Sequence, residues 1–423
     1  MKENEVSLRK FPYPYRAALA ICNDIDQTAN IEEFLEIQRF LNTEGSTQFG
    51  KGLGLEVGNS LFLDSKYHPD KQLSFSSSPK SKEMLLRFVK AKIIDSFHSY
   101  SDSKIEMSEI QKFLSLLKDE NCGITVWIDH NHSGYNLGKH STHGKGDLRN
   151  SEYYHADLTL SYGVRFAWMG EVTSIIGQAT SLTPKKIVQM LDIRHPSSII
   201  TAVKHIGKVV LGFLGFDRFL SYYSNDLVRV RTLYDGHKIY EFVRCNPHWR
   251  GPGFCANPRS FPYVFSRQNL ERLIRSEGYM ILYTHLGEKE ESDGPLPMDG
   301  WNSLRNVAKM TKNGNLFVST TSRLLQYHVR HKYLDWSWNI SNANDLIITL
   351  NAIRDPICGI YIPTRNNIQG FTFYVPSDVR TRLFVGKKRI KIRENPPDYT
   401  GRKSLSVPIY PTFSHEIFGG LLE

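Results

Sequence analysis

The feature that most constrains the fold is a regular alternation of short apolar runs with longer segments of helical periodicity. Between the runs, apolar residues recur at helical spacing over residues 31–42, 81–89, 108–118 and 267–275. This rhythm predicts parallel strands joined by crossover helices. Six or seven such units favour an α/β fold, specifically a deformed (β/α)7-type barrel. The runs of strand length are residues 17–22, 54–63, 92–97, 123–128, 164–168, 278–283 and 316–320.

Two regions break this alternation. Residues 184–262 form an irregular stretch with aromatic and basic residues around YEFVRCNPHWRGPGF, and long irregular segments are often functional loops. From about Asp355 the pattern changes to short alternating segments separated by turn-forming residues. We therefore expect a barrel domain over residues 1–352 with an insertion at about 184–262, followed by a small all-β domain over residues 353–423.

Composition limits the partners of the chain. Apolar residues make up 40% and charged residues 23%, which is typical of a folded protein, and the net charge of +10 is a mild excess over 423 residues. The basic residues between 380 and 393 alternate like those on a solvated strand face, and no recognition helix accompanies them. We expect no nucleic-acid partner, whereas an anionic carbohydrate suits the charge. The sequence indicates no oligomeric state.

The cysteines and the hydropathy of the sequence indicate where in the cell the chain is expected. The five cysteines include no CxxC pair, which argues against a disulfide framework and against a thiolate zinc site. Residues 1–16 contain no apolar stretch typical of a secretory signal, and the most apolar run, 209–216, is far shorter than the ~20 residues of a membrane span. We expect a cytoplasmic chain without a transmembrane helix, one that can still be peripheral to a polysaccharide assembly complex.

Acidic residues and histidines stand at four predicted strand ends, where the chemistry of α/β barrels is located. Asp24 and Asp26 follow the first strand on the same side, and two carboxylates so close repel each other unless a cation or a shared proton separates them. His98, His130 and His285 follow three other strands. Histidine is a common ligand of divalent metals and a common acid or base near neutral pH. Singly, each histidine fits a loop role, but together they favour a metal-dependent catalytic site.

A second group of polar residues follows the fourth strand and continues into the insertion. Interleaved tyrosine, histidine and aspartate suit binding to sugar hydroxyls and stacking on sugar rings, although a polar surface loop explains the same residues equally well. His155 with Asp157 is also a possible metal-ligand pair. The predicted substrate-binding residues are Asp129, His132, Asp147, Tyr154, His155, Arg244, Trp249 and Arg250.

Three segments between about Ala17 and Leu325 resemble motifs of the polysaccharide deacetylase (NodB-homology) family, within the glycoside hydrolase/deacetylase (β/α) barrel superfamily. LAICNDID resembles the first motif, an apolar strand ending in paired aspartates. GLEVGNSLFLDS resembles the strand of the second motif, and GYMILYTHLG resembles the last motif, which delivers a catalytic histidine. IIDSFHSYSD and VWIDHNHSGYN are similar to segments of relatives encoded in bacterial surface-polysaccharide clusters.

The resemblance has two departures. The aspartates of the first motif are separated by Ile25, and Ser60 and Asp64 stand where the family has its two metal-binding histidines. The usual His-His-Asp site therefore cannot be built from the motif positions. If a metal is bound, His98 and His130 are the replacement ligands that we predict.

The resemblance implies a metal-dependent carbohydrate deacetylase, a hydrolase that acts on an acetylated polysaccharide or glycan precursor in surface-polysaccharide metabolism. A divalent cation, with zinc as the expected metal, would activate a water molecule. Asp24 would take the proton of this water, Asp26 would hold the metal, and His285 would protonate the leaving amine. Arg244 or Arg250 would orient the base or bind an anionic sugar.

Two other functions remain open. The first is a glycoside hydrolase of the same superfamily, with Asp24 or Asp26 as nucleophile and Glu171 as the second carboxylate. The second is a non-catalytic glycan-binding or assembly protein that has lost the metal, for which Ser60 and Asp64 are the best evidence.

Overall fold

The largest sheet has nine strands in the order β10-β11-β8-β7-β6-β5-β2-β13, with β14 paired to β2. The computed structural model describes residues 6–25, 27–28, 30–65, 72–131, 133–138, 142–192, 194–254, 256–288, 298–341, 344–377, 379–413 and 415–418. The nine strands are β2 (Ala17–Asn23), β5 (Gly58–Leu61), β6 (Ile94–His98), β7 (Val126–Ile128), β8 (Phe166–Trp168), β10 (Val228–Thr232), β11 (Lys238–Phe242), β13 (Tyr279–Thr284) and β14 (Leu316–Ser319).

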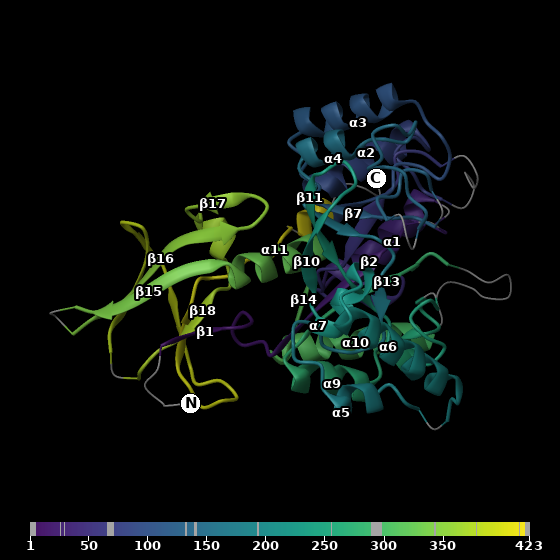
Figure 1. Ribbon diagram of the computed structural model, residues 1–423. Helices are drawn as coiled ribbons and strands as arrows, with labels where there is room; N and C mark the ends of the chain where they lie inside the picture. The colour runs from purple at the N-terminus through teal and green to yellow at the C-terminus, as the bar shows by residue number, and fades with distance from the viewer. Residues whose placement is uncertain are drawn as a thin grey trace.

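Neighbouring strands in this sheet are parallel, except for the antiparallel hairpin of β10 and β11. The sheet is curled, and it is not closed by hydrogen bonds between β10 and β13 among the described residues (Figure 1). Two short parallel strands, β9 (Val172–Thr173) and β12 (Arg244–Cys245), continue from β8 and β11, and Gln178 bridges to Tyr279 of β13. The predicted α/β class is confirmed, as a mixed α/β fold with a curled sheet.

Strand β2 is buried on both faces, which explains its unbroken apolar sequence AALAICN. Ala17, Leu19 and Ile21 belong to one apolar cluster with the helices outside the sheet. The alternate residues, including Ala18 and Ala20, belong to a different cluster inside the curl, which also contains residues of β7, β8, β13 and the helix after β14. Small side chains on this inner face leave room for the aromatic rings of neighbouring strands.

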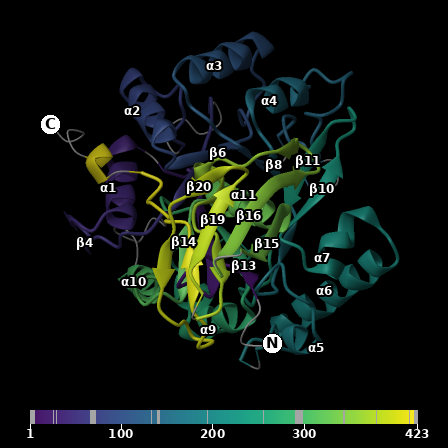
Figure 2. The ribbon, with the colours of Figure 1, turned by 90° about the vertical axis from the view of Figure 1, so that its left-hand side faces the viewer.

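Helices surround the sheet. Figures 1 and 2 show α2, α3 and α4 on one side of it and α9 and α10 on the opposite side. The sequence prediction is confirmed for all four helices that it placed, which are α1, α2, α3 and α9. The main helices are α1 (Ile31–Asn42), α2 (Pro79–Lys90), α3 (Met107–Asp119), α4 (Ala156–Tyr162), α9 (Arg267–Ser276), α10 (Met298–Lys312) and α11 (Thr321–Lys332).

The insertion is more ordered than we expected from its sequence. It contains the helices α5 (Pro184–Val188), α6 (Ser197–Phe213), α7 (Leu220–Ser224) and α8 (Phe261–Val264), a short 3-10 turn at Asp217–Phe219, and the strands β10, β11 and β12. Because β11 pairs with β8, the insertion supplies an edge of the main sheet. The segment 184–262, which we expected to be irregular, therefore contains regular helices and strands.

Two further sheets form a β-rich region beside the main sheet (Figures 1 and 2). One contains β15 (Leu334–Ile340), β16 (Leu346–Asp355), β17 (Gly359–Tyr361), β19 (Thr381–Val385) and β20 (Lys388–Ile390), and the other contains β1 (Ser7–Arg9), β18 (Thr372–Tyr374), β22 (Ser404–Ser406) and β21 (Arg393–Asn395). Short 3-10 turns occur at Arg365–Ile368 and His415–Phe418, and a small hairpin of β3 (Ser46–Thr47) and β4 (Gly50–Lys51) follows α1.

The β-rich region draws on both ends of the chain. One apolar cluster contains residues of both sheets, including Leu350 and Phe373. The expected boundary at 352/353 falls inside β16, and the sheet already begins at Leu334. In addition, β1 near the N-terminus pairs with β18.

Among the described residues, no helix combines the length and the apolar character that crossing a membrane requires. Cys22, Cys122, Cys245 and Cys358 are free thiols.

A network of buried amides fixes the carboxyl end of β2. The side chains of Asn59 and Gln38 exchange two hydrogen bonds of 2.9 Å, and Asn59 also accepts one of 2.9 Å from Asn23. Asn59 donates to the carbonyl of Ile93 as well, at 3.1 Å. Asn23 in turn accepts the backbone N–H of Leu286. The network therefore ties α1 and the segment after β13 to one edge of the sheet.

Replacing Asn59 with alanine should lower the free energy of unfolding by about 3 kcal/mol, because it leaves buried amide groups of Asn23 and Gln38 without partners. Urea denaturation measures this change. The matched control is Asn313→Ala, on an exposed asparagine, which should change stability by no more than about 0.5 kcal/mol. An equally small effect at Asn59 would contradict the structural role of the network.

Candidate functional site

Asp24 lies at the carboxyl end of β2 and is almost completely buried, with 2% of its surface exposed. Its two carboxylate oxygens accept hydrogen bonds from the guanidinium of Arg244 at 3.1 and 3.2 Å. The hydroxyl of Ser60 donates to Oδ1 at 3.1 Å. Such a carboxylate is oriented and stabilised in its charged form.

Arg244 comes from β12, at the other end of the curled sheet, and is also buried. Its guanidinium carbon lies 4.2 Å from the centre of the Trp168 ring and 4.9 Å from that of Tyr283. Burial lowers the pKa of Arg244, but the charge and hydrogen bonds of Asp24 together with Cys22 and Tyr283 outweigh this effect, so the pKa lies above its ordinary value. The indole N–H of Trp168 donates to the backbone oxygen of Glu171 at 2.8 Å, which fixes this ring in place.

Ser60 lies between Asp24 and His98. Its hydroxyl proton is donated to the carboxylate, and its oxygen lies 3.1 Å from His98 Nδ1. Because a hydroxyl has one proton, Nδ1 must be the donor in this second contact, and when the ring is neutral Nε2 is an acceptor. Nε2 lies 4.0 Å from Asp24 Oδ2. Two such acceptors repel each other unless a proton or a cation lies between them.

His285 reaches the same edge of the sheet from β13. The backbone N–H of Asp24 donates to the carbonyl of Thr284 at 2.8 Å, so the two strand ends are joined directly. The imidazole of His285 is 9% exposed and meets the ring of Tyr283 edge-on, with centroids 6.2 Å apart. The structure thus brings the predicted base and the predicted acid to neighbouring strand ends.

The described residues do not test the metal prediction. His98 and His130 converge from neighbouring strands, with ring centroids 4.8 Å apart, and both rings contact Phe62. Within the described part of the chain, no three His, Cys, Asp or Glu side chains form a ready metal centre. The third predicted ligand, Asp26, lies outside the described residues. The two imidazoles, with Nε2 of His98 as an acceptor, suit zinc or a similar divalent ion.

Several predicted substrate-binding residues instead hold the segment after β7 together. Asp129 accepts hydrogen bonds of 2.7–2.9 Å from Trp127, Leu137, Gly138 and Thr142. A Cβ at Gly138 would lie 2.6 Å from Asp129 Oδ2, so this position requires glycine. Burial raises the pKa of Asp129 to about 6. This network makes Asp129 a positioning residue of the loop and gives no support to contact with substrate.

His155, Asp147 and Tyr154 have similar local roles. His155 is completely buried, its Nδ1 lies 2.7 Å from Thr159 Oγ1, and burial lowers its pKa to about 4. Asp147 accepts the backbone N–H of Tyr234 at 2.9 Å, and the hydroxyl of Tyr154 donates to Asp235 at 3.2 Å. These contacts join the loop to the β10–β11 turn. The remaining residue of the group, His132, lies outside the described residues.

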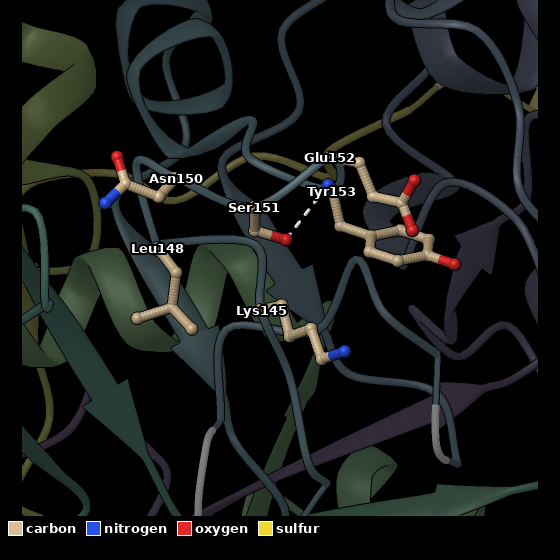
Figure 3. Close-up of a pocket in the computed structure, with 6 residues that line it drawn as sticks. All are labelled: Lys145, Leu148, Asn150, Ser151, Glu152 and Tyr153. Carbon is tan, nitrogen blue, oxygen red and sulfur yellow. Dashed lines mark hydrogen bonds between the residues drawn. The ribbon is translucent and has the colours of Figure 1, made fainter.

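A surface pocket of about 380 Å³ lies beside this loop (Figure 3). None of the predicted substrate residues lines it, although its residues are their neighbours in the sequence. The pocket is lined by Lys145, Leu148, Asn150, Ser151, Glu152 and Tyr153.

Trp249 and Arg250 lie in an aromatic cluster of the insertion. The ring of Trp249 stacks on His195 with centroids 4.2 Å apart and an interplanar angle of 7°. The guanidinium carbon of Arg250 lies 5.0 Å from the ring centres of both Trp249 and Phe254. The cluster connects the loop after β12 to the segment before α6.

Glu171, the predicted second carboxylate of a glycoside hydrolase, pairs with residues of the insertion. Its Oε1 accepts Arg218 at 2.9 Å, and its Oε2 accepts the hydroxyl of Tyr222 at 2.6 Å. The carboxylate therefore lies against the 3-10 turn and α7. This placement gives no support to a glycosidase pair with Asp24.

Residue patterns identified only part of the surroundings of Asp24. Ser60 was interpreted there as a lost metal ligand, whereas its hydroxyl contacts both Asp24 and His98. Trp168 and Tyr283 were not selected at all. The position of both rings at strand ends was the signal that could have identified them. Comparisons with known proteins add no relative, since no family model, curated protein or solved structure matches the chain.

Replacing Arg244 with methionine should lower the free energy of unfolding by roughly 3–5 kcal/mol, because Asp24 is left as a buried charge without its counterion. The double variant Asp24→Asn/Arg244→Met removes both charges and should recover about half of this loss or more. Urea denaturation of the three proteins completes the cycle. A double variant as unstable as the single one would show that packing of the arginine, rather than its charge, matters.

Because its imidazole is buried, His155 should make the stability of the protein depend on pH. Its pKa is lowered in the folded state, so unfolding takes up a proton below the ordinary pKa of histidine, and stability falls as the pH decreases from about 6.5 toward about 4. The free energy of unfolding of the wild-type protein falls between about pH 7 and about pH 5. In His155→Gln this decrease should be smaller by about 2 kcal/mol. Urea denaturation of both proteins at the two pH values measures it. An identical fall in the variant would refute the assignment.

Proposed function

We propose that this chain is a metal-dependent carbohydrate deacetylase that acts on an acetylated polysaccharide or glycan precursor, in the metabolism of a bacterial surface polysaccharide. The observation that carries the proposal is that the oriented, buried carboxylate of Asp24 and the imidazole of His285 follow two adjacent parallel strands at their carboxyl ends. The curled parallel sheet, interpreted as a deformed (β/α)7 barrel, supports it as well, because barrel enzymes place their catalytic groups at this edge.

In this proposal Asp24 is the general base. Arg244 holds its two oxygens in a fixed orientation and keeps the carboxylate ionised, so that it can accept a proton from a water molecule. His285 donates a proton to the leaving nitrogen. The partly exposed rings of Trp168 and Tyr283 offer apolar faces on which a sugar ring can pack.

His98 and His130 would hold a divalent cation together with Asp26. When bound, this cation supplies Lewis-acid polarisation of the acetyl carbonyl and lowers the pKa of a coordinated water. Ser60 orients His98 toward this position through Nδ1. The serine at this motif position therefore supports a histidine ligand from the next strand.

The test is acetate release from acetylated sugars, including N-acetylglucosamine oligomers and O-acetylated glycans, with zinc, cobalt or manganese added. Asp24→Asn and His285→Gln should each reduce kcat by at least about 100-fold, because each removes a proton-transfer group. Matched controls are Asp119→Asn and His237→Gln, on exposed residues, which should retain full activity.

The metal content of the protein separates this proposal from its alternatives. We expect one divalent ion in the wild-type protein and its loss in His98→Ala/His130→Ala. Absence of bound metal after reconstitution, together with absence of acetate release, would contradict the deacetylase. Glycan binding that persists under those conditions would favour the non-catalytic role.

A further inference from the structure

Helix α6 presents its apolar residues to the outside of the molecule. Ile199, Ile200, Val203, Ile206, Val210, Phe213 and the following Leu214 are each between 44% and 69% exposed, and we call these seven residues the α6 outer face. At the helical repeat of 100° per residue they occupy one continuous side of the helix. Single exposed apolar residues are ordinary, but a contiguous face of this kind marks an interaction surface.

The opposite side of α6 is already occupied by the protein. Ser198, Thr201 and His205 are buried there, and the ring of His205 meets that of Tyr222 in α7 edge-on, with centroids 5.6 Å apart. A Cβ at Gly212 would lie 2.4 Å from the carbonyl oxygen of Phe219, so the two segments are in close contact. The small and polar residues of α6 thus pack inward, which is the reverse of a surface helix that faces water.

Neighbouring segments extend the apolar face. Val188 and Leu191, from α5 and the residues after it, are 62% and 43% exposed, and Phe216, after α6, is 55% exposed. Figure 1 shows α5 and α6 on the side of the molecule away from the β-rich region that contains β15 and β16. The β-rich region therefore leaves this side open to a partner.

The charges around the face are predominantly positive. Residues 184–224 contain six Lys and Arg against two Asp and no Glu, and α6 itself contains lysine but no acidic residue. Both aspartates are paired with arginines, Asp192 with Arg194 at 3.0 Å and Asp217 with Arg229 at 3.1 Å. Lys185 and Lys204 are exposed. An apolar face with exposed cations beside it complements a surface of acyl chains and anionic headgroups.

We infer that the α6 outer face docks onto the surface of an anionic lipid bilayer. The helix lies parallel to the surface, the apolar side chains enter the boundary between headgroups and acyl chains, and Lys185 and Lys204 contact lipid phosphates. A second copy of the chain suits the face less well, because self-association would bring two positively charged segments together. The inference does not depend on the deacetylase proposal.

The experiment is co-sedimentation of the full-length protein with vesicles of phosphatidylcholine alone and with vesicles of equal parts phosphatidylcholine and phosphatidylglycerol. The wild-type protein should bind the anionic vesicles. The variant Val203→Ser/Val210→Ser/Phe213→Ser should bind at least about tenfold more weakly, because three apolar side chains no longer enter the lipid. Since these side chains are exposed, circular dichroism should show an unchanged fold.

The matched control is Ile340→Ser/Ile360→Ser/Ile362→Ser, on three isoleucines of the β-rich region that are 57%, 68% and 69% exposed. This control should bind anionic vesicles as the wild-type protein does. Lys185→Glu/Lys204→Glu should weaken binding, and raising the salt concentration from about 0.1 M to about 0.5 M should do the same, because salt screens the contacts with phosphate.

Three outcomes would overturn the inference. One is no binding of the wild-type protein to anionic vesicles, and another is equal binding by the apolar-face variant and the wild type. The third is a dimer in sedimentation velocity that dissociates in the apolar-face variant, without vesicle binding, which would identify the face as a contact between copies. Acetate release by the same variants is measured separately, so failure of the docking surface and failure of the deacetylase proposal are distinguishable.

Discussion

The ion pair between Asp24 and Arg244 is the constraint around which this structure is organised. It joins β2 to β12 across 220 residues of sequence, and both partners are almost completely buried. Removing two charges from water is unfavourable, and their attraction compensates only when the remaining polar atoms are also satisfied. Ser60 donates to the carboxylate, and the rings of Trp168 and Tyr283 pack against the guanidinium, whereas Nε of Arg244 has no hydrogen-bond partner among the described residues. The insertion thus becomes part of the core at the edge of the sheet.

Adjacent polar residues at the end of β2 serve different purposes because a strand alternates its faces. Asn23 turns toward α1, where it joins the buried amides of Asn59 and Gln38. Asp24 turns to the other face and meets Arg244 and the imidazole of His98. The rigid amide network on one face fixes the backbone from which the carboxylate on the other face projects. Asn23 therefore has a structural role, whereas its neighbour Asp24 projects into the candidate site.

Sequence periodicity identified the strands and helices of the main sheet because burial leaves a regular pattern in the sequence. Helix α1 buries one face, and β2, which is buried on both faces, is an unbroken apolar run. It did not identify α6, which lies in the segment that was interpreted as irregular, and it cannot show that the apolar side of this helix faces outward. Residue type located Asp24, His98 and His285 at strand ends, but it could not pair Asp24 with Arg244, which depends on the curl of the sheet. Asp129 and His155 show a related limit. Residue type alone does not distinguish a polar side chain that stabilises a loop from one that binds a sugar.

The pairing of β1 with β18 has a consequence for how the chain is made. Arg9 bonds to Tyr374, 365 residues later, and also pairs with Asp398 beyond it. At a synthesis rate of roughly 5–20 residues per second, β1 leaves the ribosome roughly 20–70 s before its partner strand exists. During that interval the rest of the chain can fold while this edge strand has nothing to pair with. Strand β1 can therefore join its sheet only after β18 has been synthesised.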